Sequence, residues 1–367
     1  MSELKTEEQT VSTNSKEVIL DVRDIYTYFR TESGVVKALD GVSFDIRKNE
    51  AVGIVGESGC GKTVTSRSIL RILPKNGEVV SGEIYYKGIN LLDLTQDQMR
   101  TVRGREIALL FQDPLSSLNP VLSIREQMVD VIKLHRRKTE EREIRKPNGE
   151  TEIVKVKRRL TDEEAAEIAI EMMKAVGIPE AEKRFDDYPH QYSGGMRQRI
   201  LIARALALQP NLLIADEPTT ALDVTIQAQV LDIIQRMRKE LGLSLMLITH
   251  NLGVVAENTD RIHVFYGGRV VESGPTRDIF KDPHHPYTIA LLESIPSFKK
   301  GKGKLSTIPG SVPQLINPPK GCRFHPRCKY KTDICETRPK MEKIGEDRYV
   351  ACFHVDKVLA DRKKANK

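Results

Sequence analysis

A glycine-rich segment directly after a short apolar run is the feature that most constrains the fold of this chain. The run is Ala51-Val52-Gly53-Ile54-Val55, and the segment reads Gly56-Glu57-Ser58-Gly59-Cys60-Gly61-Lys62-Thr63. Helical spacing continues from Thr63 to Leu73, and Pro74 stops it. The pattern predicts a strand, a glycine loop and a helix, because glycines let successive backbone N–H groups turn inward around an anion.

The glycine segment carries side chains suited to a nucleotide. Lys62 would reach the β- and γ-phosphates as a point charge, and the Thr63 hydroxyl would ligate Mg²⁺. The helix that starts at Gly61 would add the positive end of its dipole. A glycine turn without function is the alternative, and the strand before it and the helix after it count against that.

Three further apolar runs predict buried parallel strands with helical segments between them. They are residues 107–111, 212–215 and 244–248, and the alternating stretch from Val18 to Phe29 predicts another strand. We therefore expect an α/β core. Open sheets of this kind bind ligands at the carboxyl ends of their strands.

Four polar side chains follow the ends of these runs. Asp216 would hold Mg²⁺, and the adjacent Glu217 would polarise the attacking water. Without a cation nearby, these two carboxylates would repel each other. His250 could contact the γ-phosphate and orient the water, while Gln112 could complete the Mg²⁺ shell. A lone His or Gln at a strand end is usually structural, so their interpretation depends on the other motifs.

Ser193-Gly194-Gly195 precedes a helical pattern from Met196 to Leu208 and predicts a second anion-binding helix start. Two arrangements follow from this. If both phosphate-binding segments face one nucleotide in one protomer, the site is closed. If they lie apart, two protomers must pair to complete each site.

Composition and charge exclude some classes of protein. The 367 residues have room for one large core with an appendage, or for two domains. The net charge of +7 suits nucleic acid or an anionic membrane, but the chain has no Trp and few aromatic residues for base stacking, so we expect no nucleic-acid partner. With a polar start and no run of about 18 apolar residues, we expect the chain to stay in the cytosol without spanning a membrane.

Several segments differ from the core in composition. Residues 1–16 are polar, and we expect them to be disordered. A mostly helical region at about 123–192 is interrupted by a charged insertion, 136–159, whose Pro147-Asn148-Gly149 predicts a hairpin with a tight turn. We interpret the insertion as a solvated surface segment, with contact to a partner or to anionic lipid as the alternative. A Pro/Gly/Lys-rich linker, 296–319, leads to the C-terminal tail, which places a boundary near 285–305.

In this order the motifs resemble those of the ATP-binding cassette family: Walker A at 56–63, the Q-loop at Gln112, the signature at 193–198, Walker B at 212–217, the D-loop at 220–223 and the H-loop at His250. The resemblance implies a P-loop ATPase domain over 17–285, built from a RecA-like α/β subdomain, an antiparallel β subdomain and a helical signature subdomain at about 123–192. It also implies a head-to-tail dimer that sandwiches two ATP molecules.

The resemblance assigns roles to individual residues. Phe29 would stack on adenine, with Tyr28 as second choice. Catalysis would depend on Lys62, Gln112, Glu217 and His250, and Mg²⁺ on Thr63, Gln112 and Asp216. The residues implied to bind ATP are Phe29, Gly56, Glu57, Ser58, Gly59, Cys60, Gly61, Lys62, Thr63, Val64, Gln112, Ser193, Gly194, Gly195 and Asp216.

A narrower resemblance is to the ATPase subunits of oligopeptide/dipeptide permeases, carried by residues 188–199, 215–225, 284–288 and 321–328. It implies import of di- or oligopeptides from the cytoplasmic face of the membrane. The partners would be a distinct sister ATPase, two transmembrane permease subunits and, indirectly, an external peptide-binding protein. Relatives with nearly the same ATPase carry nickel, glutathione or oligosaccharides, so these substrates stay open.

A soluble non-transport cassette ATPase, acting in translation or DNA repair, is the alternative from another class. Translation factors of this kind carry two cassettes in one chain, and the repair members carry a long coiled coil between motifs; this sequence shows neither. A degenerate regulatory cassette is disfavoured by the intact Lys62, Glu217 and His250.

Four cysteines, Cys322, Cys328, Cys335 and Cys352, crowd the tail, and a reducing cytosol favours metal binding over disulfides. Their spacing lacks the close C-x₂-C pairs of structural zinc sites and suits either an iron–sulfur cluster or zinc, with His325 and His354 as further zinc ligands. Four reduced thiols that simply pack are the third interpretation. The narrower resemblance implies a [4Fe-4S] cluster in a C-terminal domain over 286–367. Cys60 is expected to pack in the phosphate loop.

Overall fold

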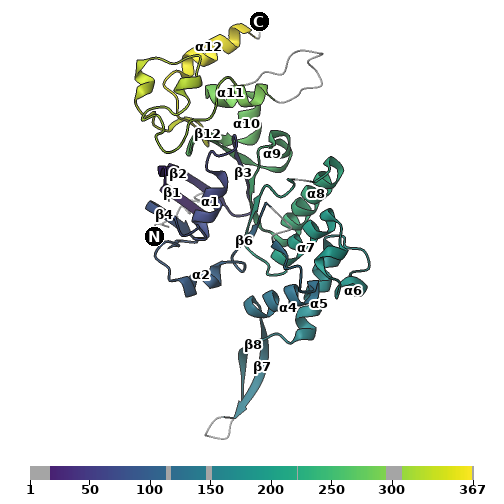
Figure 1. The fold of residues 1–367 in the computed structure, drawn as a ribbon. Helices are drawn as coiled ribbons and strands as arrows, with labels where there is room; N and C mark the ends of the chain where they lie inside the picture. The colour runs from purple at the N-terminus through teal and green to yellow at the C-terminus, as the bar shows by residue number, and fades with distance from the viewer. Residues whose placement is uncertain (1–16, 113–116, 146–150, 221, 295–307, 366–367) are drawn as a thin grey trace, which may run out of the picture.

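The structure, a computed structural model, describes residues 17–112, 117–145, 151–220, 222–294 and 308–365. Two sheets form the body, a helical lobe lies at one end, and the C-terminal residues lie at the other (Figure 1). The predicted disorder of residues 1–16 and the first half of the predicted linker fall outside the described residues. Every helix within the described ranges is too short or too polar to span a bilayer.

The central sheet has eight strands in the order β13-β14-β12-β11-β3-β10-β9-β6. Its parallel part consists of β6 (Ile107–Leu110), β9 (Leu212–Asp216), β10 (Ser244–Ile248), β3 (Ala51–Val55) and β11 (Arg261–Tyr266). Every residue of β3, β9 and β10 is buried. The apolar runs in the sequence therefore predicted β3, β6, β9 and β10 correctly, whereas β11 was not among the predicted runs.

Both faces of the parallel part of this sheet are covered, which explains why β3, β6, β9 and β10 consist almost entirely of apolar residues. Along β10, Leu245 and Leu247 pack into the core of the helical lobe, whereas Met246 and Ile248 pack toward the antiparallel sheet. Successive side chains of a strand point to opposite faces, so each strand serves both cores.

The helices that flank the parallel strands are α1 (Lys62–Ile69), α7 (Gly194–Leu206), α8 (Val224–Leu241) and α9 (Leu252–Asn258). Helix α1 ends before the predicted stop at Leu73. Arg71 adopts a left-handed conformation with φ of 52°, and its guanidinium donates to the Leu91 carbonyl over 3.0 Å. The Ile72 N–H bonds back to the Arg67 carbonyl oxygen over 3.0 Å, so a local turn with a left-handed Arg71 ends the helix before Pro74.

The second sheet is antiparallel, in the order β2-β1-β4-β5. It consists of β1 (Val18–Thr31), β2 (Gly34–Arg47), β4 (Gly77–Tyr86) and β5 (Ile89–Asn90), and α2 (Gln96–Val102) follows it. Strand β1 confirms the strand predicted from Val18 to Phe29 and extends it by two residues. This sheet brings Phe29 of β1, and Val36 and Ala38 of β2, to the same cavity as the glycine loop.

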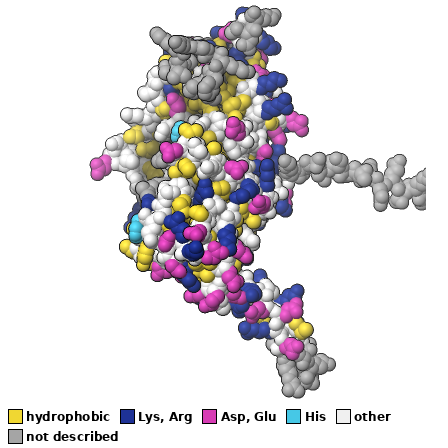
Figure 2. All heavy atoms as spheres, turned by 90° about the vertical axis from the view of Figure 1, so that its right-hand side faces the viewer, with side chains coloured by type: hydrophobic (Ala, Val, Ile, Leu, Met, Phe, Trp, Pro, Cys, Tyr) yellow, Lys and Arg dark blue, Asp and Glu magenta, His cyan; other side chains and the backbone are white. Residues whose placement is uncertain are grey.

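The helical lobe holds α4 (Ile124–His135), α5 (Asp162–Ala175), α6 (Ala181–Arg184) and the 3₁₀ turn η1 (Pro189–Gln191). Between α4 and α5, β7 (Arg137–Arg145) and β8 (Thr151–Arg159) pair antiparallel, which confirms the predicted hairpin. The predicted Asn-Gly turn lies outside the described residues. The hairpin projects from the lobe (Figure 1), and basic and acidic side chains are interspersed along it (Figure 2).

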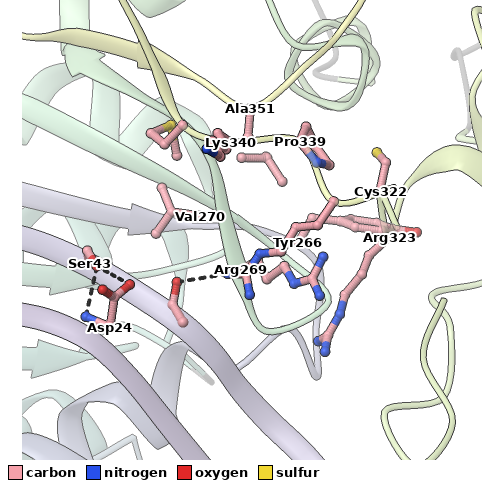
Figure 3. A pocket seen from close by; sticks show the side chains of 14 residues that line it. Asp24, Ser43, Tyr266, Arg269, Val270, Cys322, Arg323, Pro339, Lys340 and Ala351 are labelled. Carbon is pink, nitrogen blue, oxygen red and sulfur yellow. Dashed lines mark hydrogen bonds between the residues drawn. The ribbon is translucent and has the colours of Figure 1, made fainter. Parts of the chain in front are cut away.

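The C-terminal residues join the body instead of standing apart from it. Strand β12 (Arg269–Pro275) pairs with β11 on one side and with β14 (Arg348–Val350) on the other, and β13 (Glu342–Gly345) completes the sheet. Figure 3 shows Cys322 and Arg323 beside Tyr266 and Arg269 in a cavity of about 430 Å³ at this junction. The remaining elements are α10 (Thr276–Lys281), α11 (Pro286–Glu293), η2 (His325–Arg327), η3 (Asp333–Glu336) and α12 (Val355–Ala365).

Candidate active site

The glycine loop between β3 and α1 is pressed against two other strands. Gly56 has a φ of 152°, and a Cβ atom there would lie 2.2 Å from the Phe265 carbonyl oxygen of β11. Gly61 caps α1 with a φ of 104°, and its Cβ would lie 2.7 Å from the Ala38 oxygen of β2. Any larger residue would push the loop off these strands, so glycine is required at both positions.

Lys62 lies within the loop, as expected of a phosphate-binding lysine. Its Nζ donates to the Gly56 carbonyl oxygen over 2.8 Å and to the Glu57 carbonyl oxygen over 3.0 Å. The side chain is only 6% exposed. The ammonium is thus held by the backbone that would surround the phosphates.

Asp216 ends β9, as predicted, and its carboxylate faces the first turn of α1. Thr63 Oγ1 donates to Oδ1 over 3.1 Å, and Ser66 Oγ is 3.4 Å from Oδ2. Burial raises the pKa of Asp216, and the adjacent Glu217 raises it further. A cation would relieve this cost, so the site fits Mg²⁺ held by Asp216 and Thr63. Ser66 belongs to none of the sequence motifs, although its position one turn after Thr63 places it on the same helix face.

Glu217 lies where three polar side chains converge. His250 Nδ1 is 3.2 Å from Oε1, while Gln112 Nε2 and Thr220 Oγ1 donate to Oε2 over 3.2 and 2.9 Å. Burial alone would raise its pKa, but the hydrogen bonds from His250 and Thr220 outweigh burial and lower it. Glu217 is therefore ionised at neutral pH, the state a water-polarising base needs. Thr220 was not among the predicted site residues; its place three residues after Glu217 is the signal that could have identified it.

A cavity of about 720 Å³ brings most of the predicted residues together. Tyr28 is not among its lining residues, and its hydroxyl is 3.5 Å from Asp40 Oδ1. Asp216 instead lines an adjoining hollow with Thr63 and Gln112. Leu315, from the C-terminal part of the chain, lines the cavity without any local sequence signal. The lining residues are Phe29, Val36, Ala38, Ser58, Gly59, Gly61, Lys62, Thr63, Val64, Gln112, Glu217, Thr220, His250 and Leu315.

The second anion-binding segment lies elsewhere. Ser193 caps α7, and its Oγ accepts a hydrogen bond from the Met196 N–H over 3.3 Å. Ser193 and Gly194 are exposed. Among the described residues that line the large cavity, none comes from 193–195. One chain thus presents two phosphate-binding segments that do not face the same cavity.

The structure does not support the predicted iron–sulfur cluster. All five cysteines are free thiols, and within the described residues no group of three or more His, Cys, Asp or Glu side chains is arranged to hold a metal ion. Burial raises the pKa of Cys322 to about 11 and that of Cys352 to about 12. Cys322 and Cys328 pack against an aromatic cluster, as in the packing interpretation.

Cys60 behaves as predicted. It is fully buried in the phosphate loop, and its Sγ lies 3.9 Å from Lys62 Nζ.

Similar proteins identify the family. Residues 39–220 match the family described as ABC transporter, and residues 271–335 match the one described as oligopeptide/dipeptide transporter, C-terminal region. A probable peptide ABC transporter ATP-binding protein of Sinorhizobium fredii is 46% identical over 346 residues, which cover 94% of this chain and 97% of that protein. The chain belongs to the ABC transporter family.

Other comparisons agree with this assignment. The oligopeptide transport ATP-binding protein OppD of Bacillus subtilis is 44% identical to this ABC protein, over 90% of this chain and 87% of that one. A solved dimeric ATP-binding cassette in a post-hydrolysis state, bound to ADP and phosphate, superposes with a TM-score of 0.58 and 26% identity over 70% of this chain and 99% of that one. The cassette fold, the resemblance to peptide permease ATPases and the ATP-hydrolysing activity are confirmed.

Proposed function

We propose that this ABC ATPase energises import of di- and oligopeptides, acting from the cytoplasmic face of the cell membrane through partner membrane subunits. The observation that carries the proposal is that Lys62, Gln112, Glu217 and His250 converge on one cavity beside Phe29. The substrate class is supported by the match of residues 271–335 and by the two relatives whose names specify peptide or oligopeptide transport.

In this proposal the loop 56–63 wraps the phosphates of ATP with its backbone N–H groups, Val64 flanks it, and Phe29 stacks on adenine. Thr63, Gln112 and Asp216 would hold Mg²⁺, whose charge offsets that of the phosphates. The raised pKa of the buried Asp216 supports a cation at this place.

Hydrolysis would depend on Glu217. Its ionised carboxylate would accept a proton from the attacking water, and His250, 3.2 Å away, would orient that carboxylate and the water. Lys62 would leave the loop carbonyls for the phosphates and neutralise the charge that develops there. Gln112 would connect Glu217 to the Mg²⁺ site.

The proposed working assembly is a head-to-tail pair of ATPases, with a distinct sister chain as partner. The exposure of Ser193 and Gly194 away from the cavity supports pairing, because these groups would complete the site of the other protomer. The solved relative is likewise dimeric. Two transmembrane permease subunits and, indirectly, an external peptide-binding protein would complete the importer; we expect no nucleic acid.

We further propose that the chain consists of an ATPase domain over 17–285, which includes a helical subdomain at about 123–192, and a C-terminal domain over 286–367. In that last domain the four thiols would hold a [4Fe-4S] cluster, with Zn²⁺ as the alternative. The narrower sequence resemblance is what supports a cluster here; among the described residues, no three His, Cys, Asp or Glu side chains are arranged to hold a metal ion.

The iron, sulfide and zinc content of anaerobically purified protein tests the cluster directly. About four iron and four sulfide per chain would establish it. Zinc without iron or sulfide would replace it with a zinc site, and the absence of all three would leave four packed thiols.

Uptake by cells tests the transport proposal. Cells that carry the wild-type chain or its Glu217→Gln variant are given labelled di- and oligopeptides and, separately, nickel. Loss of peptide uptake alone in the variant would establish a peptide importer. Loss of nickel uptake with unchanged peptide uptake would keep the ATPase and replace the substrate; glutathione and oligosaccharides are tested in the same way. If no uptake changes, the chain is a non-transport ATPase.

A further inference from the structure

The C-terminal part of the chain contacts the phosphate loop directly. Arg327, at the end of η2, donates from Nη1 to Glu57 Oε2 over 2.8 Å and from Nη2 to Oε1 over 3.1 Å. This is a two-point contact between guanidinium and carboxylate, the strongest geometry for such a pair. The side chain of Arg327 is 5% exposed and that of Glu57 is 26% exposed.

Arg327 is itself held in place by its surroundings. Its Nε donates to the Pro309 carbonyl oxygen over 2.8 Å, and its Nη1 lies 3.2 Å from the Tyr266 hydroxyl. The guanidinium also lies over the rings of Tyr266 and Phe324, at 5.8 and 6.0 Å from their centroids. An arginine fixed at so many points loses little further freedom when it binds Glu57.

Glu57 is held from a second side as well. Its backbone N–H donates to the Tyr287 hydroxyl over 2.9 Å. Tyr287 is fully buried, and its ring lies 4.5 Å from that of Tyr266 and 5.4 Å from that of Phe324. The aromatic cluster and Arg327 thus hold both the main chain and the side chain of the second residue of the loop.

The contact reaches the phosphate-binding lysine through one residue. The carbonyl oxygen of Glu57 accepts a hydrogen bond from Lys62 Nζ over 3.0 Å. A carboxylate in an anion-binding loop would repel the phosphates of ATP, and pairing with Arg327 cancels that repulsion. Loss of Arg327 would therefore both loosen the loop and leave an unpaired negative charge on the loop that binds the phosphates.

We propose that Arg327 is a positioning residue of the nucleotide site. It holds Glu57 so that the phosphate loop keeps a shape and a charge that accept ATP, and in this way the C-terminal part of the chain sets ATP affinity. The inference rests on the proposed function of the large cavity as the ATP site. Arg327 itself touches no reacting atom, so its effect belongs to binding and not to the chemical step.

The test measures binding of an N-methylanthraniloyl analogue of ATP, with Mg²⁺, to the purified full chain by fluorescence. Arg327→Ala is expected to raise the dissociation constant about tenfold, the loss expected for one hydrogen bond to a charged group. Arg327→Lys keeps the charge without the two-point geometry, and we expect a rise of about threefold. Turnover at saturating ATP should stay within about twofold of wild type, because uniform binding affects KM alone.

A double substitution separates positioning from general damage. If Arg327 acts through Glu57, then Glu57→Gln combined with Arg327→Ala removes the unpaired charge, and the dissociation constant should return to within about threefold of wild type. Arg362→Ala is the matched control, since it breaks another ion pair of the C-terminal part, to Asp282, at 3.0 Å and away from the loop. This control should bind the analogue like wild type.

Three binding results would overturn the positioning role of Arg327. Binding by Arg327→Ala and Arg327→Lys within twofold of wild type would overturn the proposal, as would an equal loss in the Arg362→Ala control or additive losses in the double variant. If Arg327→Ala does not fold, as judged by its melting temperature, Arg327→Gln, which also removes the positive charge, carries the same comparison alone and in combination with Glu57→Gln. A wild-type chain that does not bind the analogue would refute the ATP site itself, which is a separate failure.

Discussion

Glu217→Gln is the substitution that tests the proposed chemistry most sharply. Two of the three groups around this side chain, Gln112 and Thr220, donate to the same oxygen, Oε2. A glutamine can place its carbonyl oxygen there and keep both contacts. Its amide nitrogen then faces His250 Nδ1, which can accept a hydrogen bond when the ring is neutral. The variant should therefore keep the shape of the site and lose at most about 1 kcal/mol of stability.

The amide cannot accept a proton from water, so the chemical step should suffer greatly. Loss of a general base typically lowers turnover about 10²–10⁴-fold. Phosphate release is the assay for turnover, and fluorescence of the ATP analogue is the assay for binding, which should stay within about twofold. We also expect a trapped closed dimer, visible by size-exclusion chromatography in the presence of ATP.

Two results would refute this argument. Turnover by Glu217→Gln within tenfold of wild type would show that another group activates the water. A loss of ATP binding equal to the loss of turnover would show that Glu217 supports nucleotide binding instead of chemistry. Asp97→Asn, which alters an exposed carboxylate that pairs with Arg100 within the described part of the chain, should leave turnover unchanged and serves as the control.

Two further predictions concern pH and stability. Because hydrogen bonds from His250 and Thr220 lower the pKa of Glu217, its carboxylate stays ionised further into the acid range than that of an ordinary glutamate. The acid limb attributable to Glu217 in the ATPase pH profile should therefore lie on the acid side of an ordinary glutamate, and a limb on the neutral side would contradict this. Asp40→Asn leaves the guanidiniums of Arg269 and Arg323 without their shared carboxylate, at 2.7 and 2.8 Å, and should cost about 3–5 kcal/mol in urea unfolding. Asp21→Asn, at a more exposed pair, should cost less than about 1 kcal/mol.

Local features of the fold could be predicted from the sequence because local physics determines them. The strand at 51–55, the glycine loop and the helix after it depend on apolar burial and on backbone conformations that only glycine adopts easily. Ser193 was identifiable as the start of α7 because capping is a contact across three residues. The resemblance carried by the order of the motifs then indicated that the strand ends before Gln112, Asp216 and His250 lie close together.

Contacts between distant segments could not be predicted in this way. Glu57 and Arg327 are 270 residues apart, and neither has a local signal that names the other. Leu315 reaches the nucleotide cavity through a backbone hydrogen bond in which its oxygen accepts from the Lys37 N–H over 2.8 Å. The spacing of the tail cysteines likewise restricts which metals they could bind. It does not predict whether the four thiols lie close together, because burial and packing determine their positions.

The position of Lys62 shows what nucleotide binding must change in this site. Lys62 is only 6% exposed, and its ammonium is bound to two carbonyl oxygens of the loop, so protein contacts have already replaced part of its water before ATP arrives. When the Lys62 ammonium moves to the phosphates, it exchanges neutral carbonyl acceptors for charged phosphate oxygens. Its hydrogen bonds become stronger, and little further water is lost in the exchange. The carbonyls of Gly56 and Glu57 lose their donor in the same step, and the part of the loop at Glu57 is the part that the C-terminal residues hold. A loop fixed at this point can release its lysine without collapsing, which is why we expect the C-terminal contact to act on ATP affinity.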